Sequence, residues 1–554
     1  MKTPDRPLLL FLFFHLALFL QFPLTGRLPG NTDTLLSISL TNLINERVLL
    51  ALSGLSGHTI FYPVTEFWAF GENCFALGWM FTFFKLLTRS DHWAYYFFMV
   101  SIFTANSYAI HRLAKLFVES AEAALLAGFA FALSNFMLGH IDDANVVFVF
   151  FPVMGLVSLE SGLRSGERAD FRRAALFSSL QIWFGMYVFA FQFIALAIFA
   201  LIRFKRLREC LALREVAKLG AIYVLPALPI ILLYVSNASR PDLTSPYGNE
   251  LSRRLSSLHW YHFRNVLPGN LLYSSETNVW FPEDDPSPWY NFRKMAFPGF
   301  VLPVFALFGF IASKLRENKS VRPLAMMVLS FGALAFGSNL FDFESIVALP
   351  FGTFFRVASR AHLFALIAIS VFFAIGVEKV IFVLGKKSRW ATKWVPLAIG
   401  VFFILENVPF PMIGYDYTGL LEPAASYSKF FEKFPERQVV ADVPSDYQAR
   451  LPQTAPVWTY SRDALYMNWQ TYHRQIIIGG INSYLPKTRL EADELIQKLP
   501  DSEALAGLRK LSVGWIVFHK KFVLFERENV LDGLEKAEGL KKEFEDADLA
   551  IFRL

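Results

Sequence analysis

Apolar residues recur in long runs over roughly the first three quarters of the chain, and short polar segments separate the runs. A helix that crosses a membrane needs about 17–25 mostly apolar residues. Most of the runs approach that length, so we predict an α-helical polytopic membrane protein with about eleven transmembrane helices. The predicted spans are residues 8–24, 93–111, 121–138, 145–160, 174–187, 188–203, 219–237, 298–313, 323–340, 361–384 and 394–411.

Lys and Arg cluster in short segments between these runs: 111–115, 164–173, 203–218, 314–322 and 385–393. Cytoplasmic loops carry such an excess of positive charge. All of these loops can be cytoplasmic if the apolar run 73–88 lies on the membrane surface and 174–203 breaks into two spans near Gly185 and Tyr187. The N-terminus is then inside, the C-terminus is outside, and residues 25–92 form a long first outer loop.

The composition changes after about residue 412, where charges become frequent and short apolar runs alternate with helical patterns. We therefore predict a membrane domain at 1–411 and a C-terminal extracytoplasmic α/β domain at 412–554. The expected strands lie at 439–443, 475–478, 515–518 and 549–552, and the expected helices at 488–499 and 501–511.

The bulk composition supports a membrane protein: 54% of the residues are hydrophobic and 18% are charged, against about 25% charged in soluble domains. The net charge of +6 comes from the basic loops and is not a nucleic-acid signal. Cys74 and Cys210 fall on opposite sides of the predicted membrane, which argues against a disulfide. Residues 8–24 have no cleavage site before Gly26 and are expected to remain as the first helix. No Walker, GxSxG or HExxH pattern occurs, which disfavours ATP-driven transport and serine hydrolysis.

The first candidate for chemistry is the isolated acid of Gly30-Asn31-Thr32-Asp33-Thr34, just beyond the first span. As a general base, Asp33 would deprotonate an acceptor hydroxyl, and as a ligand it would hold a metal ion that orients a phosphate. The alternative is structural, because Thr32 or Asp33 would also suit the N-cap of a helix over 34–52.

Two more clusters belong to predicted outer segments. Asp142 and Asp143 follow His140 in a short turn, and two carboxylates beside a His suit a divalent cation; a polar turn that caps the next helix is the alternative. His58 and Glu66 share the first outer loop with Asp33 and are either site residues or ordinary exposed loop residues.

Arg356 and Arg360 lie just before the span that starts near residue 361. They fall on the predicted outer side, against the positive-inside trend. Arginine holds phosphate through paired hydrogen bonds, so this exception favours a site for an anion over a simple topology anchor.

The chain resembles the GT-C superfamily of polytopic glycosyltransferases over nearly its whole length. It is most similar to bacterial members related to protein O-mannosyltransferases and lipid A aminoarabinose transferases, including the YfhO-like group. The segments that carry the resemblance, besides Asp33, are His58 to Pro63, Glu66 to Asn73, Tyr108 to Ala114, Phe131 to Asn135 with Gly139-His140, Phe355 to Arg360, and Leu511 to His519.

The resemblance implies an inverting transfer of a hexosyl or pentosyl group from a polyprenyl-phosphate donor to a glycan, lipid or protein acceptor at the outer face of a bacterial inner membrane. Asp33 would be the general base, and outer basic residues would hold the lipid phosphate. Many relatives have a second acid in the first-loop motif, where this chain has Asn31 and Thr32, so the part played by a divalent cation stays open.

Two other classes of function remain. A transporter or flippase of lipid-linked sugars would show a polar path through its spans and repeated halves; few charges lie within the predicted spans, and no repeat is evident. A non-catalytic envelope-assembly protein would keep the fold without turnover.

Overall fold

The described residues form two units whose segments alternate along the chain. The first, here called the membrane unit, comprises Met1–Thr25, Tyr96–Leu232 and Gly248–Tyr415, and the second, the α/β unit, comprises Gly26–Tyr95, Leu233–Tyr247 and Asp416–Leu554. The computed structural model describes the chain except for residues 1–4, 30–31, 53–58, 65–70, 72–73, 239–241, 245–256, 268, 271, 274–294, 316, 343–344, 347–354, 356, 387, 413, 417–420, 446–457, 482–484 and 523–527.

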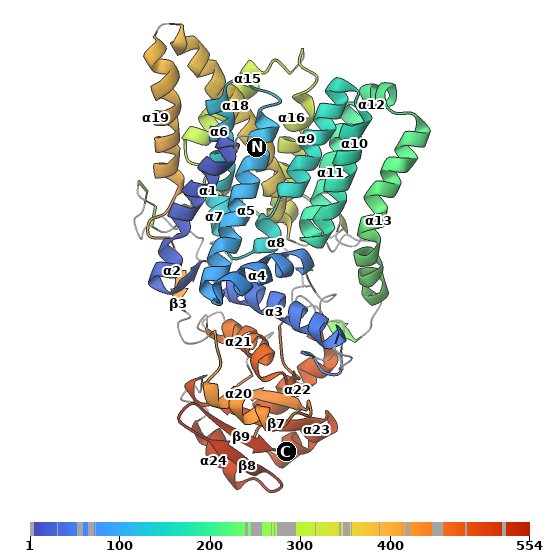
Figure 1. Ribbon diagram of the computed structural model, residues 1–554, viewed down its shortest axis with the longest axis vertical. Helices are drawn as coiled ribbons and strands as arrows, with labels where there is room; N and C mark the ends of the chain where they lie inside the picture. The colour runs from blue at the N-terminus through green and yellow to red at the C-terminus, as the bar shows by residue number, and fades with distance from the viewer. Residues whose placement is uncertain are drawn as a thin grey trace. The chain divides into compact units, whose positions relative to one another are not determined.

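The membrane unit is a bundle of helices (Figure 1). Each of the predicted spans falls on helical residues. The helices are α1 (Arg6–Phe19), α2 (Gln21–Thr25), α5 (Asp91–Ala114), α6 (Ala121–Ala132), α7 (Asn135–Gly139), α8 (Ala144–Val147), α9 (Phe150–Ser165), α10 (Arg168–Leu180), α11 (Met186–Ile202), α12 (Phe204–Cys210), α13 (Leu213–Ala238), α15 (Val301–Ala312), α16 (Arg322–Phe336), α18 (His362–Gly385) and α19 (Arg389–Asn407), with 3₁₀ turns η2 (Gln181–Trp183), η3 (Trp260–Arg264), η6 (Gly337–Asn339) and η8 (Ala358–Ala361).

Among the described residues, five helical stretches are long and apolar enough to cross a membrane, or six if the bent pair α11 and α12 counts as one span. The five are Arg6–Thr25, Ala121–Gly139, Ala144–Ser165, Leu213–Ser236 and Ala358–Gly385. The chain is therefore a multi-pass integral membrane protein. The count of about eleven stays a prediction, because the other ranges fall on helices that are shorter or more polar, such as the 12-residue α15.

The break predicted within residues 174–203 is confirmed. Helix α10 ends at Leu180, the turn η2 follows, and α11 begins at Met186 after Gly185, whose backbone is extended. Helix α10 packs on α9, and the two are joined through Gly166, a left-handed C-cap with φ +80°. Glycine is favoured there because it has no Cβ to clash.

Helix α18 lies in the core of the membrane unit, and its residues are buried almost without interruption from His362 to Val377. It packs against α15, α16, α6 and α19. The closest approach is to α15, where a Cβ on Gly309 would overlap the carbonyl oxygen of Phe372 and a Cβ on Gly376 would overlap that of Phe305. Small residues permit such close backbone packing between membrane helices.

The α/β unit contains a five-stranded sheet with the order β5-β4-β7-β9-β8. Strand β4 pairs in parallel with β5 and β7, whereas β9 pairs antiparallel with β7 and β8. Every strand expected from the sequence is confirmed, whereas β8 was missed because its edge sequence is mostly charged. The strands are β4 (Val439–Val443), β5 (Ile476–Ile477), β7 (Val513–His519), β8 (Lys541–Glu545) and β9 (Leu549–Arg553).

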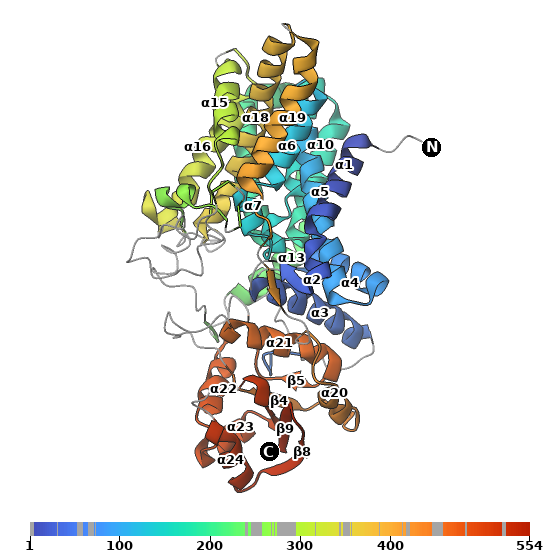
Figure 2. The same ribbon diagram turned by 90° about the vertical axis from the view of Figure 1, so that its left-hand side faces the viewer.

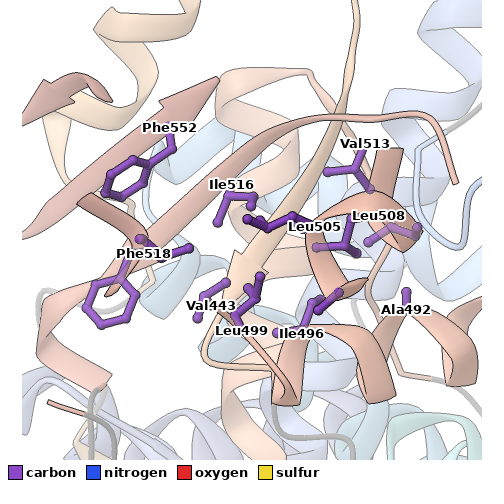
Figure 3. Packing of buried hydrophobic residues seen from close by; sticks show 14 of the residues in the cluster. Val443, Ala492, Ile496, Leu499, Leu505, Leu508, Val513, Ile516, Phe518 and Phe552 are labelled. Carbon is purple, nitrogen blue, oxygen red and sulfur yellow. The ribbon is translucent and has the colours of Figure 1, made fainter. Parts of the chain in front are cut away.

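Helices cover both faces of this sheet. On one face, Val443, Ile516 and Phe518 pack against α22 (Lys487–Gln497), α23 (Ser502–Lys510) and α24 (Glu528–Lys536), as Figure 3 shows for part of this core. The alternate strand residues face α20 (Ala425–Glu432) and α21 (Trp458–His473), seen on the other side in Figure 2. The predicted helices at 488–499 and 501–511 correspond to α22 and α23.

The first predicted outer loop belongs to this α/β unit. Helix α3 (Thr32–Leu52) packs on α21, where Ser39 Oγ donates to the Ala464 carbonyl at 2.6 Å and Asn42 Nδ2 donates to Asn468 Oδ1 at 2.7 Å. Helix α4 (Phe75–Thr88) packs on α3 in turn. Its 14 residues span about 21 Å at 1.5 Å each, too short to cross a bilayer core of about 30 Å.

The same loop also covers an edge of the sheet. The Ile477 N–H donates to the Thr59 carbonyl at 2.8 Å, and the Phe61 N–H donates to the Gly479 carbonyl at 3.2 Å. These bonds occupy backbone groups of the edge strand β5 and of Gly479 just beyond it, which would otherwise be open to pairing with another chain. The remaining short elements are β1 (Arg27–Pro29), β2 (Leu243–Thr244), β3 (Gly414–Asp416), β6 (Leu485–Pro486) and η9 (Lys520–Phe522).

Candidate functional site

The turn at residues 140–143 connects two broken helical segments in the membrane unit. Ser134 caps α7 by accepting a hydrogen bond from the Met137 N–H, and the one-turn helix α8 begins at Ala144. His140, Asp142 and Asp143 are all buried, with exposed fractions of 2%, 2% and 7%. Polar side chains that are this inaccessible to solvent rarely lack partners. The turn is therefore a buried polar cluster and not a solvated hairpin.

Arg360 supplies the opposite charge. Its Nη2 donates to Asp143 Oδ2 at 2.8 Å, and the two side chains are only 13% and 9% exposed. The guanidinium carbon also lies 4.5 Å from the ring centroid of Tyr187, a cation–π distance. The structure thus brings together two residues that the sequence placed in separate candidate clusters.

Arg360 reaches this position because it sits in η8, the turn that immediately precedes α18. Burial of the following residues of α18 fixes that turn against the core. Tyr187, in the first turn of α11, was considered in the sequence only as part of a helix break. An aromatic residue beside such a break carries no signal for arginine binding, so only the fold reveals this contact.

Two histidines lie beside the ion pair. The Phe136 ring centroid is 4.4 Å from the ring of His140 and 5.0 Å from that of His362. His140 Nδ1 lies 2.9 Å from the Phe136 carbonyl oxygen. Burial lowers the pKa of His140 to about 4, although the Asp143 carboxylate acts in the opposite direction. His140 is therefore neutral at neutral pH and adds no positive charge to the cluster.

Asp33 lies in the first turn of α3, in the α/β unit, and its side chain lies outside the described residues. The expected helix over 34–52 is present, but it begins at Thr32, so Thr32 and Asp33 lie within its first turn and neither is its N-cap. The role of Asp33 as a general base stays a prediction. His58, Glu66 and Arg356 also lie outside the described residues.

Within the part of the chain that the structure describes, no group of three or more His, Cys, Asp or Glu side chains could hold a metal ion. In the 140–143 turn, Asp143 pairs with Arg360 instead. Participation of a divalent cation stays a prediction, because the side chain of Asp33 is not among those described.

The fold resembles that of a solved arabinofuranosyltransferase, which agrees at the level of the fold with the resemblance seen in the sequence. The chain is similar to a mutant of the mycobacterial arabinofuranosyltransferase AftD, with a TM-score of 0.62 and 13% identity in one cryo-EM class and 0.57 and 14% in another. Each alignment covers 100% of this chain and 42% of AftD, so the chain spans less than half the length of that enzyme.

A weaker similarity is to ArnT from Cupriavidus metallidurans bound to undecaprenyl phosphate, with a TM-score of 0.49, 14% identity and coverage of 98% of this chain and 97% of ArnT. No family model matches the chain, and no curated protein matches its sequence. At these identities, the two AftD structures establish the fold and no more.

Proposed function

We propose that the protein transfers a sugar from a polyprenyl-phosphate donor to an acceptor at the outer face of a bacterial inner membrane. The observation that carries this proposal is the buried Arg360–Asp143 ion pair at the start of α18. Charged side chains at a membrane edge are costly and mark functional sites by default. The GT-C fold, shared with an arabinofuranosyltransferase, supports sugar transfer as the function of that site.

Arg360 would bind the donor phosphate. A guanidinium is planar and always charged, and its fork of N–H groups matches the oxygens of a phosphate. Asp143 and the ring of Tyr187 hold it in place before the donor arrives, so little reorganisation is needed when charge develops on the leaving phosphate. Arg356, four residues earlier in the chain, is proposed as a second phosphate ligand.

Asp33 would act as the general base. The acceptor hydroxyl oxygen attacks the anomeric carbon, the bond from that carbon to the phosphate oxygen breaks, and the electron pair leaves with the polyprenyl phosphate. The hydroxyl proton goes to the Asp33 carboxylate. Attack from the side opposite the leaving group inverts the anomeric configuration. The donor needs no nucleotide, which suits a site on the extracytoplasmic side.

The test uses purified protein in nanodiscs, titrated with a polyprenyl-phosphate sugar and with polyprenyl phosphate alone. We expect Arg360→Ala to weaken binding of both lipids by at least about tenfold, since a charge-assisted hydrogen bond contributes about 1.5–3 kcal/mol. Arg172→Ala is the matched control, because Arg172 is exposed in α10. Equal lipid binding by the Arg360→Ala protein and this control would exclude Arg360 as the phosphate ligand.

The same preparation separates the alternatives. Sugar appearing on an acceptor supports a transferase. A labelled lipid that crosses liposome membranes chemically unchanged, with no transfer, would point to a transporter instead. Adding EDTA during the transfer assay shows whether a divalent cation takes part.

A further inference from the structure

The connections of the sheet in the α/β unit change direction at β4. The chain passes from β4 through α21 to β5 on one face, then through α22 and α23 to β7 on the other face. Strands β4 and β7 are parallel neighbours, and the connection that leaves β7 runs through α24, which packs in the same core as α22 and α23. The connections that leave β4 and β7 therefore lie on opposite faces of the sheet. Ligands of open α/β sheets bind at such switch points, beyond the carboxyl ends of the strands.

A buried polar pair occupies this edge. His519 is the last residue of β7, and its Nε2 lies 2.7 Å from Oδ1 of Asp442, near the end of β4. The Tyr427 hydroxyl donates to the same carboxylate oxygen at 2.9 Å. A carboxylate oxygen only accepts hydrogen bonds, so His519 donates to it through Nε2–H.

His519 and Tyr427 line a cavity of about 20 Å³, which has room for one or two water-sized groups. Trp469 and Phe522 form an aromatic wall, with stacked rings 5.9 Å apart. Lys521 and Asp548 also line the cavity and pair at 2.9 Å. The lining residues are Glu422, Ala424, Tyr427, Trp469, His519, Lys521, Phe522, Asp548 and Leu549.

The charges narrow the class of ligand. Glu422, Asp548 and the neighbouring Asp442 outweigh the single ammonium of Lys521, which disfavours a phosphate or a carboxylate. The described residues also contain no cluster suited to a metal ion. A neutral ligand with many hydroxyl groups remains, because carboxylates accept hydrogen bonds from hydroxyls while aromatic rings pack on an apolar face.

We propose that this switch-point pocket is a sugar-binding subsite, which takes one hydroxyl or hydroxymethyl group into the cavity and packs the sugar ring near Phe522. Such a sugar belongs either to the acceptor or to the lipid-linked donor. Its assignment to the acceptor rests on the proposed transferase function, whereas binding of a sugar does not depend on that function.

The experiment measures saturation-transfer NMR with the full-length protein in nanodiscs and three separate probes: methyl α-D-arabinofuranoside, methyl α-D-mannopyranoside and methyl β-D-galactopyranoside. We expect a saturation-transfer signal from at least one glycoside bound to the native protein. Phe522→Ala removes the aromatic contact and should reduce the affinity for that glycoside about fivefold. Glu422→Gln should reduce this affinity as well. Glu432→Gln is the matched control, an exposed carboxylate in α20 that does not line the cavity.

Phe522 and Glu422 line the cavity and are not fully buried. The melting temperature of each variant is measured to confirm that it folds. The proposal would be overturned if no glycoside gave a saturation-transfer signal, or if Phe522→Ala and Glu432→Gln bound the glycoside with equal affinity. Lipid binding by the native protein is measured in a separate titration, so loss of glycoside binding and loss of lipid binding show which of the two proposals fails. Competition by a polyprenyl-phosphate sugar, but not by polyprenyl phosphate, would assign the pocket to the donor sugar.

Discussion

The guanidinium of Arg360 donates to the carboxylate of Asp143 at 2.8 Å across 217 residues of chain. Neither partner is well solvated. Removing one member of a buried ion pair leaves the other without compensation and costs about 3–5 kcal/mol. The two side chains therefore depend on each other in the fold, and the Asp143 carboxylate holds the Arg360 guanidinium in place.

Asp143→Ala should lower thermal stability more than the double variant Asp143→Ala with Arg360→Met, because only the single variant leaves a buried charge unpaired. Melting temperatures in nanodiscs give the comparison. Additive losses from the two single changes would show that the pair is not coupled.

The contact between α15 and α18 depends on glycine. Gly376→Ala places a Cβ against the carbonyl oxygen of Phe305, and such overpacking costs about 1–3 kcal/mol. Gly332→Ala in α16 is the matched control, because nothing lies within 4 Å of its added Cβ. We expect a lower melting temperature for the first variant only. Equal melting temperatures would contradict the close packing of α15 and α18.

Acid should destabilise the α/β unit through His473. Burial lowers the pKa of His473 to about 4, with the nearby Asp442 acting to raise it and with His519 and Arg437 acting to lower it further. Between the unfolded pKa of 6.5 and this folded value, the unfolded chain binds a proton that the folded chain does not. Stability from this group is therefore full above pH 6.5 and falls by about 1.4 kcal/mol per pH unit below it.

His473→Asn keeps an acceptor for the Gln475 N–H, which donates to Nδ1 in the native protein, but it cannot be protonated. Melting temperatures recorded from pH 7.5 to 4.5 should therefore fall less steeply in this variant than in the native protein. Parallel pH profiles would rule out His473 as the cause.

Helix α4 exposes an apolar stripe, with Trp79 55%, Phe83 58%, Leu86 75% and Leu87 66% exposed. A helix with one apolar face lies in the membrane interface, which agrees with the surface helix expected at 73–88. Lipids brominated near their head groups should quench the Trp79 component of the fluorescence, isolated by subtracting the Trp79→Phe variant. Quenching that is identical in the two proteins would place this stripe away from lipid.

Much of the architecture follows from local patterns. Apolar length located helices at every predicted span, and alternating or buried apolar runs located β4, β5, β7 and β9. The break before Met186 was predicted from the distribution of basic loops. These features are set by neighbouring residues, which is why the sequence reveals them.

The long-range relationships were not accessible in the same way. A positive charge on the predicted outer side of the membrane marked Arg360 as a candidate site residue, and the adjacent acids marked Asp143. No local sequence pattern shows that these two residues are in contact. The packing of the first loop on α21, through Ser39 and Asn42, is likewise a tertiary property. Asp442 stands out only as a polar residue inside an apolar strand, and its partner His519 comes 77 residues later.

The most direct measurement is transfer of labelled sugar from a polyprenyl-phosphate donor by purified protein, comparing the native chain with Asp33→Asn. This change removes the charge of the proposed base and keeps its shape, so we expect normal donor binding with transfer reduced by about 10²-fold or more. Native-level transfer by the Asp33→Asn protein, or no transfer by the native protein to any envelope acceptor, would contradict the account.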